Sequence, residues 1–180
     1  MAAAPARLKI SHSLGNSSGK GGFLFLQGVK LNSWYEADRR RLVREYRLVR
    51  SFHPDFELKL INGCLAWEGE TSVIPPPLTA PPLRFRIEYP SGFPVAAISV
   101  FPLSPDFSPE EWGHTWHRWQ DGRICIVHPR MWRIMYTARD VIEKVVDWYY
   151  NYLAYKHGLI TAMPDVGRAI LMSELKEGGV

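Results

Sequence analysis

Apolar and polar residues follow two spacings along this chain, and the longer spacing predicts a first helix over residues 34–49. The apolar positions of this helix fall three or four residues apart, as on the buried face of an amphipathic helix, and are Leu42, Tyr46 and Val49. Ser33 and Glu36 stand at its start in the Ser-x-x-Glu order of a capping box. The residue before a proline avoids helical geometry, so His53-Pro54 should end it.

The same spacing predicts a second, deeply packed helix that starts at Thr137 and Asp140 and stops at Gly158. Two adjacent apolar rows make its buried face wide, and they are Val141, Val145, Trp148 and Tyr152, with Ile142, Val146, Tyr149 and Leu153. Residues 166–175 could add a short helix.

Alternation with period two predicts four strands between these helices. Residues 56–60 and 64–71 flank Asn62-Gly63, a strong signal for a tight turn. Residues 83–89 alternate strictly, and 95–101 are expected to form a fourth, more buried strand. One helix, an antiparallel meander and a second helix indicate an α+β fold.

With 180 residues the chain suits one domain, which we expect over 33–158, with an extension at 1–32 and a tail at 159–180. The extension has a weak strand-like piece at 8–10 and a glycine-rich segment at 15–22. That segment lacks the spacing of a phosphate-binding loop, so a linker or hairpin turn is the better interpretation.

Six arginines crowd residues 39–50, while the net charge is only +4. A basic face attracts nucleic acid, membranes or acidic proteins, but no aromatic residues alternate with these arginines as a base-stacking surface needs. We therefore expect neither a nucleic acid nor a membrane partner. The sequence shows no signal peptide and no transmembrane run, which favours a cytoplasmic protein whose two cysteines, Cys64 and Cys125, are free thiols.

The segment 113–129 concentrates the candidate chemistry, because Cys125 stands there with His114, His117 and His128. Three interpretations of these residues compete. Cys125 is a nucleophile whose pKa nearby imidazoles or arginines lower; the four residues are zinc ligands; or the thiol is an inert core group.

The order of elements resembles the ubiquitin-conjugating fold, and the resemblance spans residues 33–157. The Tyr-Pro-x-x-Phe-Pro segment at 89–94 matches the family's turn between its third and fourth strands. Gly-Arg-Ile-Cys-Ile at 122–126 matches its active-site segment, and Trp132 matches the tryptophan that follows the cysteine. The eukaryotic family carries an Asn eight residues before its cysteine. Here that residue is His117, and a histidine at this place is similar to what several bacterial relatives show.

This resemblance implies an N-terminal helix, a four-stranded antiparallel meander, an active-site loop and C-terminal helices. It implies that Cys125 takes the C-terminal glycine of a carrier protein as a thioester and passes it to an amine, without cofactor or metal. His117 would support the oxyanion or move a proton, with His114 and His128 as further candidates.

The resemblance also implies the partners. Bacterial members of the family work with ubiquitin-like or other glycine-tailed carrier proteins, often in antiphage gene clusters. In some of these gene clusters the partner is a nucleotidyltransferase. Arg40, Arg41 and Arg44 would contact an activating enzyme, or would simply be a solvated helix face. The alternatives are a noncatalytic protein-interaction module with a structural zinc or an inert cysteine, and an unrelated Cys-His hydrolase.

Overall fold

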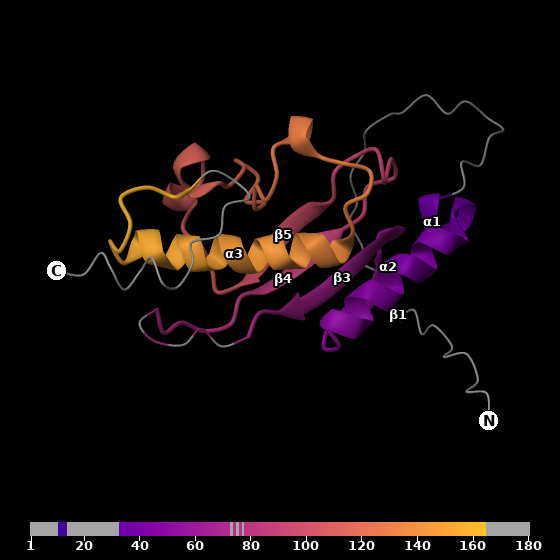
Figure 1. Ribbon diagram of the computed structural model, residues 1–180, viewed down its shortest axis with the longest axis horizontal. Coiled ribbons are helices and arrows are strands. Elements are labelled where there is room, and N and C mark those ends of the chain that lie inside the picture. The colour runs from indigo at the N-terminus through magenta and orange to yellow at the C-terminus, as the bar shows by residue number, and fades with distance from the viewer. Residues whose placement is uncertain (1–10, 14–32, 73, 75, 77, 165–180) are drawn as a thin grey trace.

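A computed structural model describes residues 11–13, 33–72, 74, 76 and 78–164, and it has two layers. The helices α2 and α3 lie on one face of a sheet, with α2 beside the start of α3 (Figure 1). The predicted α+β class is confirmed. Within the described ranges, no helix combines the length and the apolar character that a bilayer crossing requires.

The sheet contains the predicted antiparallel meander and one strand more. Its order is β1-β2-β3-β4-β5, where the meander consists of β2 (Glu57–Ile61), β3 (Cys64–Glu70), β4 (Arg84–Glu88) and β5 (Ser99–Ser104). The added strand β1 (Ser11–Ser13) lies parallel to β2 at the sheet edge. Asn62 and Gly63 have φ values of 50° and 78°, the left-handed geometry that an Asn-Gly hairpin turn requires.

The sheet face that carries the helices is apolar because alternate strand residues point to it. One row of paired residues crosses all four strands of the meander and is buried: Leu58, Trp67, Ile87 and Val100. The period-two spacing of the sequence is therefore the spacing of the core.

The first helix is interrupted, so the prediction of one continuous helix over 34–49 is wrong. The break lies at Asp38, between α1 (Trp34–Ala37) and α2 (Arg39–Phe52), and its φ and ψ of −123° and 77° are not helical. The Asp38 carboxylate accepts a hydrogen bond from the Arg41 amide at 2.9 Å. Asp38 is thus the N-cap of α2, and this local bond competes with a continuous helix.

Both outer ends of this helical pair are as predicted. Ser33 and Glu36 form the capping box, with the Ser33 amide donating to the Glu36 carboxylate at 2.9 Å. His53 is the C-cap, and its amide donates to the Val49 carbonyl at 2.7 Å.

The fourth strand of the meander starts later than predicted. Residues 91–96 form turns, in which the amides of Val95 and Ala96 both donate to the Gly92 carbonyl at 3.0 and 2.9 Å. Val95 is 78% exposed, and β5 begins only at Ser99. The expected buried strand over 95–101 is therefore wrong for its first half, because local turn bonds hold that part.

The second helix is confirmed as α3 (Ala138–Lys156). Thr137 and Asp140 form its capping box, and Gly158 follows its end with a φ of 70°. Of the two predicted apolar rows, Val146 is half-buried and the others are buried: Val141, Val145, Trp148, Tyr152, Ile142, Tyr149 and Leu153.

The packed body continues past the expected boundary at residue 158, since Ile160 and Met163 are half-buried against the core. Three further expectations lie outside the described residues: the strand at 8–10, the glycine-rich segment at 15–22 and the short helix at 166–175.

Candidate active site

Cys125 lies on a short ladder of main-chain hydrogen bonds that continues the sheet beyond β5. Ile124 donates its amide to a β5 carbonyl at 2.9 Å and pairs antiparallel with Arg118, which pairs in turn with Gly113. The Cys125 amide donates to the His117 carbonyl at 2.7 Å. The main chain at the cysteine is therefore held by the sheet, although the loop around it contains only short 3₁₀ segments.

A tight turn over residues 119–123 joins the two sides of this ladder. The Trp119 amide donates to the Arg123 carbonyl at 2.8 Å, and the Gly122 amide donates back to the Trp119 carbonyl at 2.9 Å. Gly122 has a φ of 83°, which a glycine tolerates best. Asp121 accepts hydrogen bonds from both the amide and the guanidinium of Arg123, at 3.1 and 2.7 Å. This turn sets His117 beside Cys125.

The Cys125 thiol is half-buried between two residues that enter the core. Ile124 and Ile126 are 3% and 4% exposed. Because side chains alternate along extended chain, the cysteine between them faces away from that core. Burial raises the pKa of the Cys125 thiol and is the one contribution to its shift. The expectation that imidazoles or arginines lower this pKa is therefore wrong.

The three histidines have different surroundings. His117 is buried and has left-handed backbone geometry, with a φ of 47°, at the end of the 3₁₀ segment His114–Trp116. The rings of His114 and His117 meet edge to face with centroids 6.0 Å apart. His128 is exposed, and its Nδ1 accepts the Arg130 amide at 3.2 Å. The structure thus brings His114 and His117 together and gives His128 a separate environment.

The zinc interpretation needs at least three of these side chains around one point. In the part of the chain that the structure describes, no three His, Cys, Asp or Glu residues are grouped closely enough to hold a metal ion. The sequence spacing that resembled a zinc site does not become a ligand cluster in this fold.

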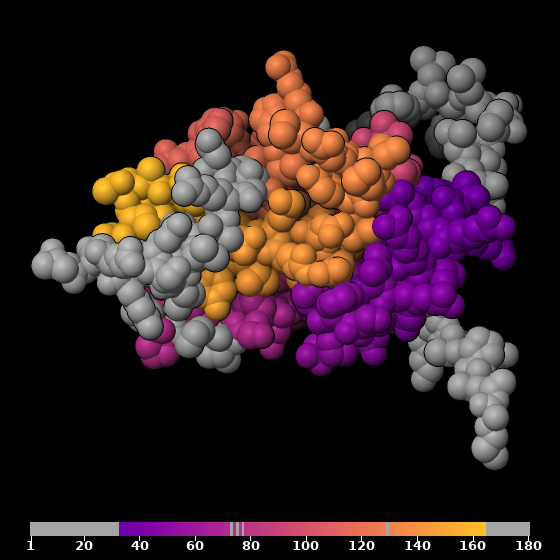
Figure 2. Space-filling view, viewed as in Figure 1, coloured from indigo at the N-terminus to yellow at the C-terminus, as the bar shows by residue number. Residues whose placement is uncertain are grey.

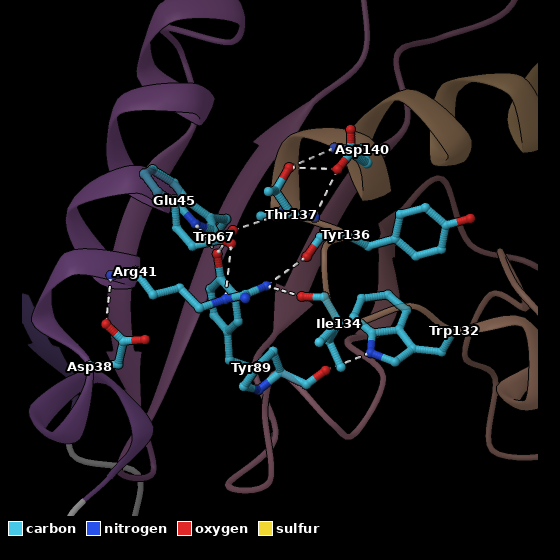
Figure 3. Close-up of polar contacts among 12 residues, drawn as sticks. Asp38, Arg41, Glu45, Trp67, Tyr89, Trp132, Ile134, Tyr136, Thr137 and Asp140 are labelled. Carbon is cyan, nitrogen blue, oxygen red and sulfur yellow. Dashed lines mark hydrogen bonds and ion pairs between the residues drawn. The ribbon is translucent and has the colours of Figure 1, made fainter.

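The basic helix face divides into two kinds of arginine. Arg40 and Arg44 are exposed on α2, as a partner-binding face requires. Arg41 instead turns inward, where its Nη2 donates to the carbonyls of Ile134 and Tyr136 at 2.7 and 3.0 Å (Figure 3). Arg41 therefore fixes the segment that precedes α3.

Glu45 is a buried carboxylate that connects α2 to α3, and sequence reasoning missed it. Its Oε2 accepts hydrogen bonds from the Tyr89 hydroxyl at 2.9 Å and from the Ala138 amide at 2.8 Å, while Arg41 Nε lies 3.7 Å from its Oε1 (Figure 3). Burial raises the pKa of the Glu45 carboxyl, against the lowering effect of these donors and of Arg41. A signal existed, because Glu45 falls on the apolar stripe of the predicted helix, four residues before Val49.

The segment after Cys125 carries exposed apolar side chains. Met131, Ile134 and Met135 are 59%, 62% and 63% exposed. Figure 2 shows this orange segment rising from the surface beside the indigo helices. Trp132, in the same segment, is half-buried and donates its Nε1 to the Pro94 carbonyl at 2.8 Å, which connects the segment to the turn before β5.

Comparison with known proteins adds no relative, because no protein-family model and no curated protein matches this chain.

Proposed function

We propose that this chain is a ubiquitin-conjugating-like acyl transferase with Cys125 as its nucleophile. The Cys125 thiolate attacks the C-terminal glycine carbonyl of a carrier protein, and the activating enzyme's thiolate leaves as the new S–C bond forms. An amine then attacks the same carbon, the S–C bond breaks, and the amine's proton passes to a base or to water.

The observation that carries this proposal is the placement of Cys125. Its main chain is fixed by bonds to His117 and, through Ile124, to β5, while its side chain remains partly accessible. An acyl-transfer nucleophile needs a fixed position and an open approach. A thiol sealed in the core, or one that ligates a metal ion, would lack the open approach.

Three histidine side chains are candidates for supporting roles in the transfer. His117, whose carbonyl holds the Cys125 amide, is the nearest candidate to stabilise the oxyanion or to move a proton, and His114 packs against its ring. His128 follows Cys125 in the chain, is exposed, and is the weaker candidate.

For the partners, we propose a ubiquitin-like or other glycine-tailed carrier and an activating enzyme that contacts the exposed face of α2. Arg40 and Arg44 remain suited to this contact. Arg41 does not, because its guanidinium is engaged with the segment before α3.

The test is a charging assay that supplies a glycine-tailed ubiquitin-like protein, an activating enzyme and ATP. We expect an adduct that a reducing agent releases. Cys125→Ser should replace it with a stable ester or abolish it, whereas Cys64→Ser, which changes the other half-buried cysteine, should charge normally. Unchanged conjugation by Cys125→Ser would overturn the proposal.

A noncatalytic interaction module with an inert cysteine is the second candidate, because burial raises the pKa of the Cys125 thiol. An inert thiol predicts no adduct under any charging condition, and partner binding that survives Cys125→Ala. Stoichiometric zinc that Cys125→Ala removes would instead favour a structural metal site.

A further inference from the structure

Arg118 is a buried cation directly before the turn over residues 119–123, which leads to Cys125. It is 6% exposed, and its Nη2 donates to the Gly122 carbonyl at 2.6 Å. Its guanidinium lies over the Phe107 ring, 4.8 Å from the ring centre. The Gly122 carbonyl belongs to the turn and lies three residues before the cysteine, so this bond reaches from one side of the turn to the other.

The rest of the guanidinium has few partners. Within the described residues, Nε and Nη1 of Arg118 are buried without a hydrogen-bond partner. Burial lowers the pKa of Arg118, while Glu111 and Tyr152 act in the opposite direction. A buried cation with unsatisfied N–H groups costs stability, and an apolar side chain of similar volume is often neutral or better. Stability alone therefore does not explain an arginine here.

The position of Arg118 between other elements gives a reason for an arginine at this place. Glu111, whose charge raises the pKa of Arg118, is held by α3, since it accepts hydrogen bonds from Tyr152 at 2.9 Å and from Lys156 at 2.7 Å. The Arg118 main chain pairs with Gly113 on one side and with the strand that contains Cys125 on the other. Arg118 thus stands between the helix layer and the turn.

Arg118 does not act on the thiol directly. Neighbours across an antiparallel pair face the same side, so Arg118 shares a side with Ile124, whereas the next residue along the chain faces the other way. Its charge also makes no contribution to the pKa of Cys125. Any influence of Arg118 on the cysteine must pass through the turn.

We propose that Arg118 is a positioning residue, which holds the Gly122 carbonyl and thereby fixes the position and orientation of the Cys125 thiol for transfer. This inference rests on the proposed function. Loss of the bond loosens the turn, which exposes the thiol to small reagents and at the same time misplaces it for a carrier protein. The two effects have opposite signs, and in a variant that is folded to the same extent as the wild type a merely structural residue would not produce that pair.

The experiment uses the full chain and the variant Arg118→Met, with Arg130→Met as the matched control, because Arg130 is an exposed arginine of the same loop. Two rates are measured: alkylation of Cys125 by iodoacetamide, followed by mass spectrometry, and charging in the assay described above. Because relieved burial lowers the pKa of the Cys125 thiol and opens the sulfur to the reagent, we expect Arg118→Met to raise the alkylation rate about threefold or more. Charging should fall about tenfold in kcat with little change in KM, the effect of a misplaced nucleophile.

Arg118→Lys should recover part of both changes, and it decides the question if Arg118→Met does not fold. Arg130→Met should change neither rate. An alkylation rate that stays at the wild-type value in folded Arg118→Met overturns the inference, whatever happens to charging. Faster alkylation in Arg118→Met together with a wild-type protein that never charges would leave the turn assignment standing and overturn the proposed function instead.

Discussion

Replacing Arg41 by methionine removes the inward-facing cation between α2 and the segment before α3. The change deletes two hydrogen bonds, to the carbonyls of Ile134 and Tyr136, and leaves the buried Glu45 without its ion-pair partner. Breaking a buried pair from one side, with loss of charge-assisted hydrogen bonds, costs about 3 kcal/mol of unfolding free energy. The adjacent Arg40 is exposed, so Arg40→Met should cost less than about 0.5 kcal/mol.

Urea unfolding followed by tryptophan fluorescence measures the difference. With a slope of about 2 kcal/mol per molar urea, the Arg41→Met midpoint should fall by about 1.5 M. The loss should also grow with pH: burial already raises the pKa of Glu45, Arg41 lowers it, and without Arg41 the folded state favours the protonated carboxyl more strongly. Equal midpoints for the Arg41 and Arg40 variants, or a loss that is the same at pH 5 and pH 8, would refute this reasoning.

Three further outcomes are expected. The iodoacetamide rate of Cys125 should climb about tenfold per pH unit and level off only above the ordinary thiol pKa, because burial raises its pKa; a plateau below pH 8 would contradict this. Gly69→Ala should destabilise by about 1–3 kcal/mol in urea unfolding, since an added Cβ would lie 2.6 Å from the buried Phe56 ring, and Phe56→Leu should relieve part of that loss. Thr137→Ala should lower the unfolding free energy by about 1 kcal/mol through the lost capping box with Asp140, and an unchanged thermal midpoint would show that the cap contributes nothing.

The parts of the fold that sequence predicted are those that local spacing controls. The capping boxes, the Asn62-Gly63 turn and the alternating strands each depend on residues close together in the chain. The errors arose where two local patterns compete. Asp38 looks like an ordinary helical position until its carboxylate caps the next turn, and Val95 looks like a strand residue until its amide bonds to Gly92.

The candidate site was predictable only as a list of residue types. Cys125 and His117 are neighbours because a turn and a ladder of main-chain hydrogen bonds bring them together. In the sequence, only the family resemblance indicated that these two residues lie close together. The arginines could not be sorted from sequence: Arg40 and Arg41 are adjacent, yet one is exposed and the other holds distant carbonyls. Arg118 carried no sequence signal, because its role depends on a main-chain oxygen.

The bond from the Ala138 amide to Glu45 places an unusual restriction on the first residue of α3. Proline is over-represented at the first position of helices, because the amide that it lacks has no hydrogen-bond partner within the helix. In this protein the amide serves a carboxylate 93 residues earlier in the chain. Ala138→Pro would thus deprive the buried Glu45 of a donor, so a substitution that sequence statistics recommend is one that this fold should reject.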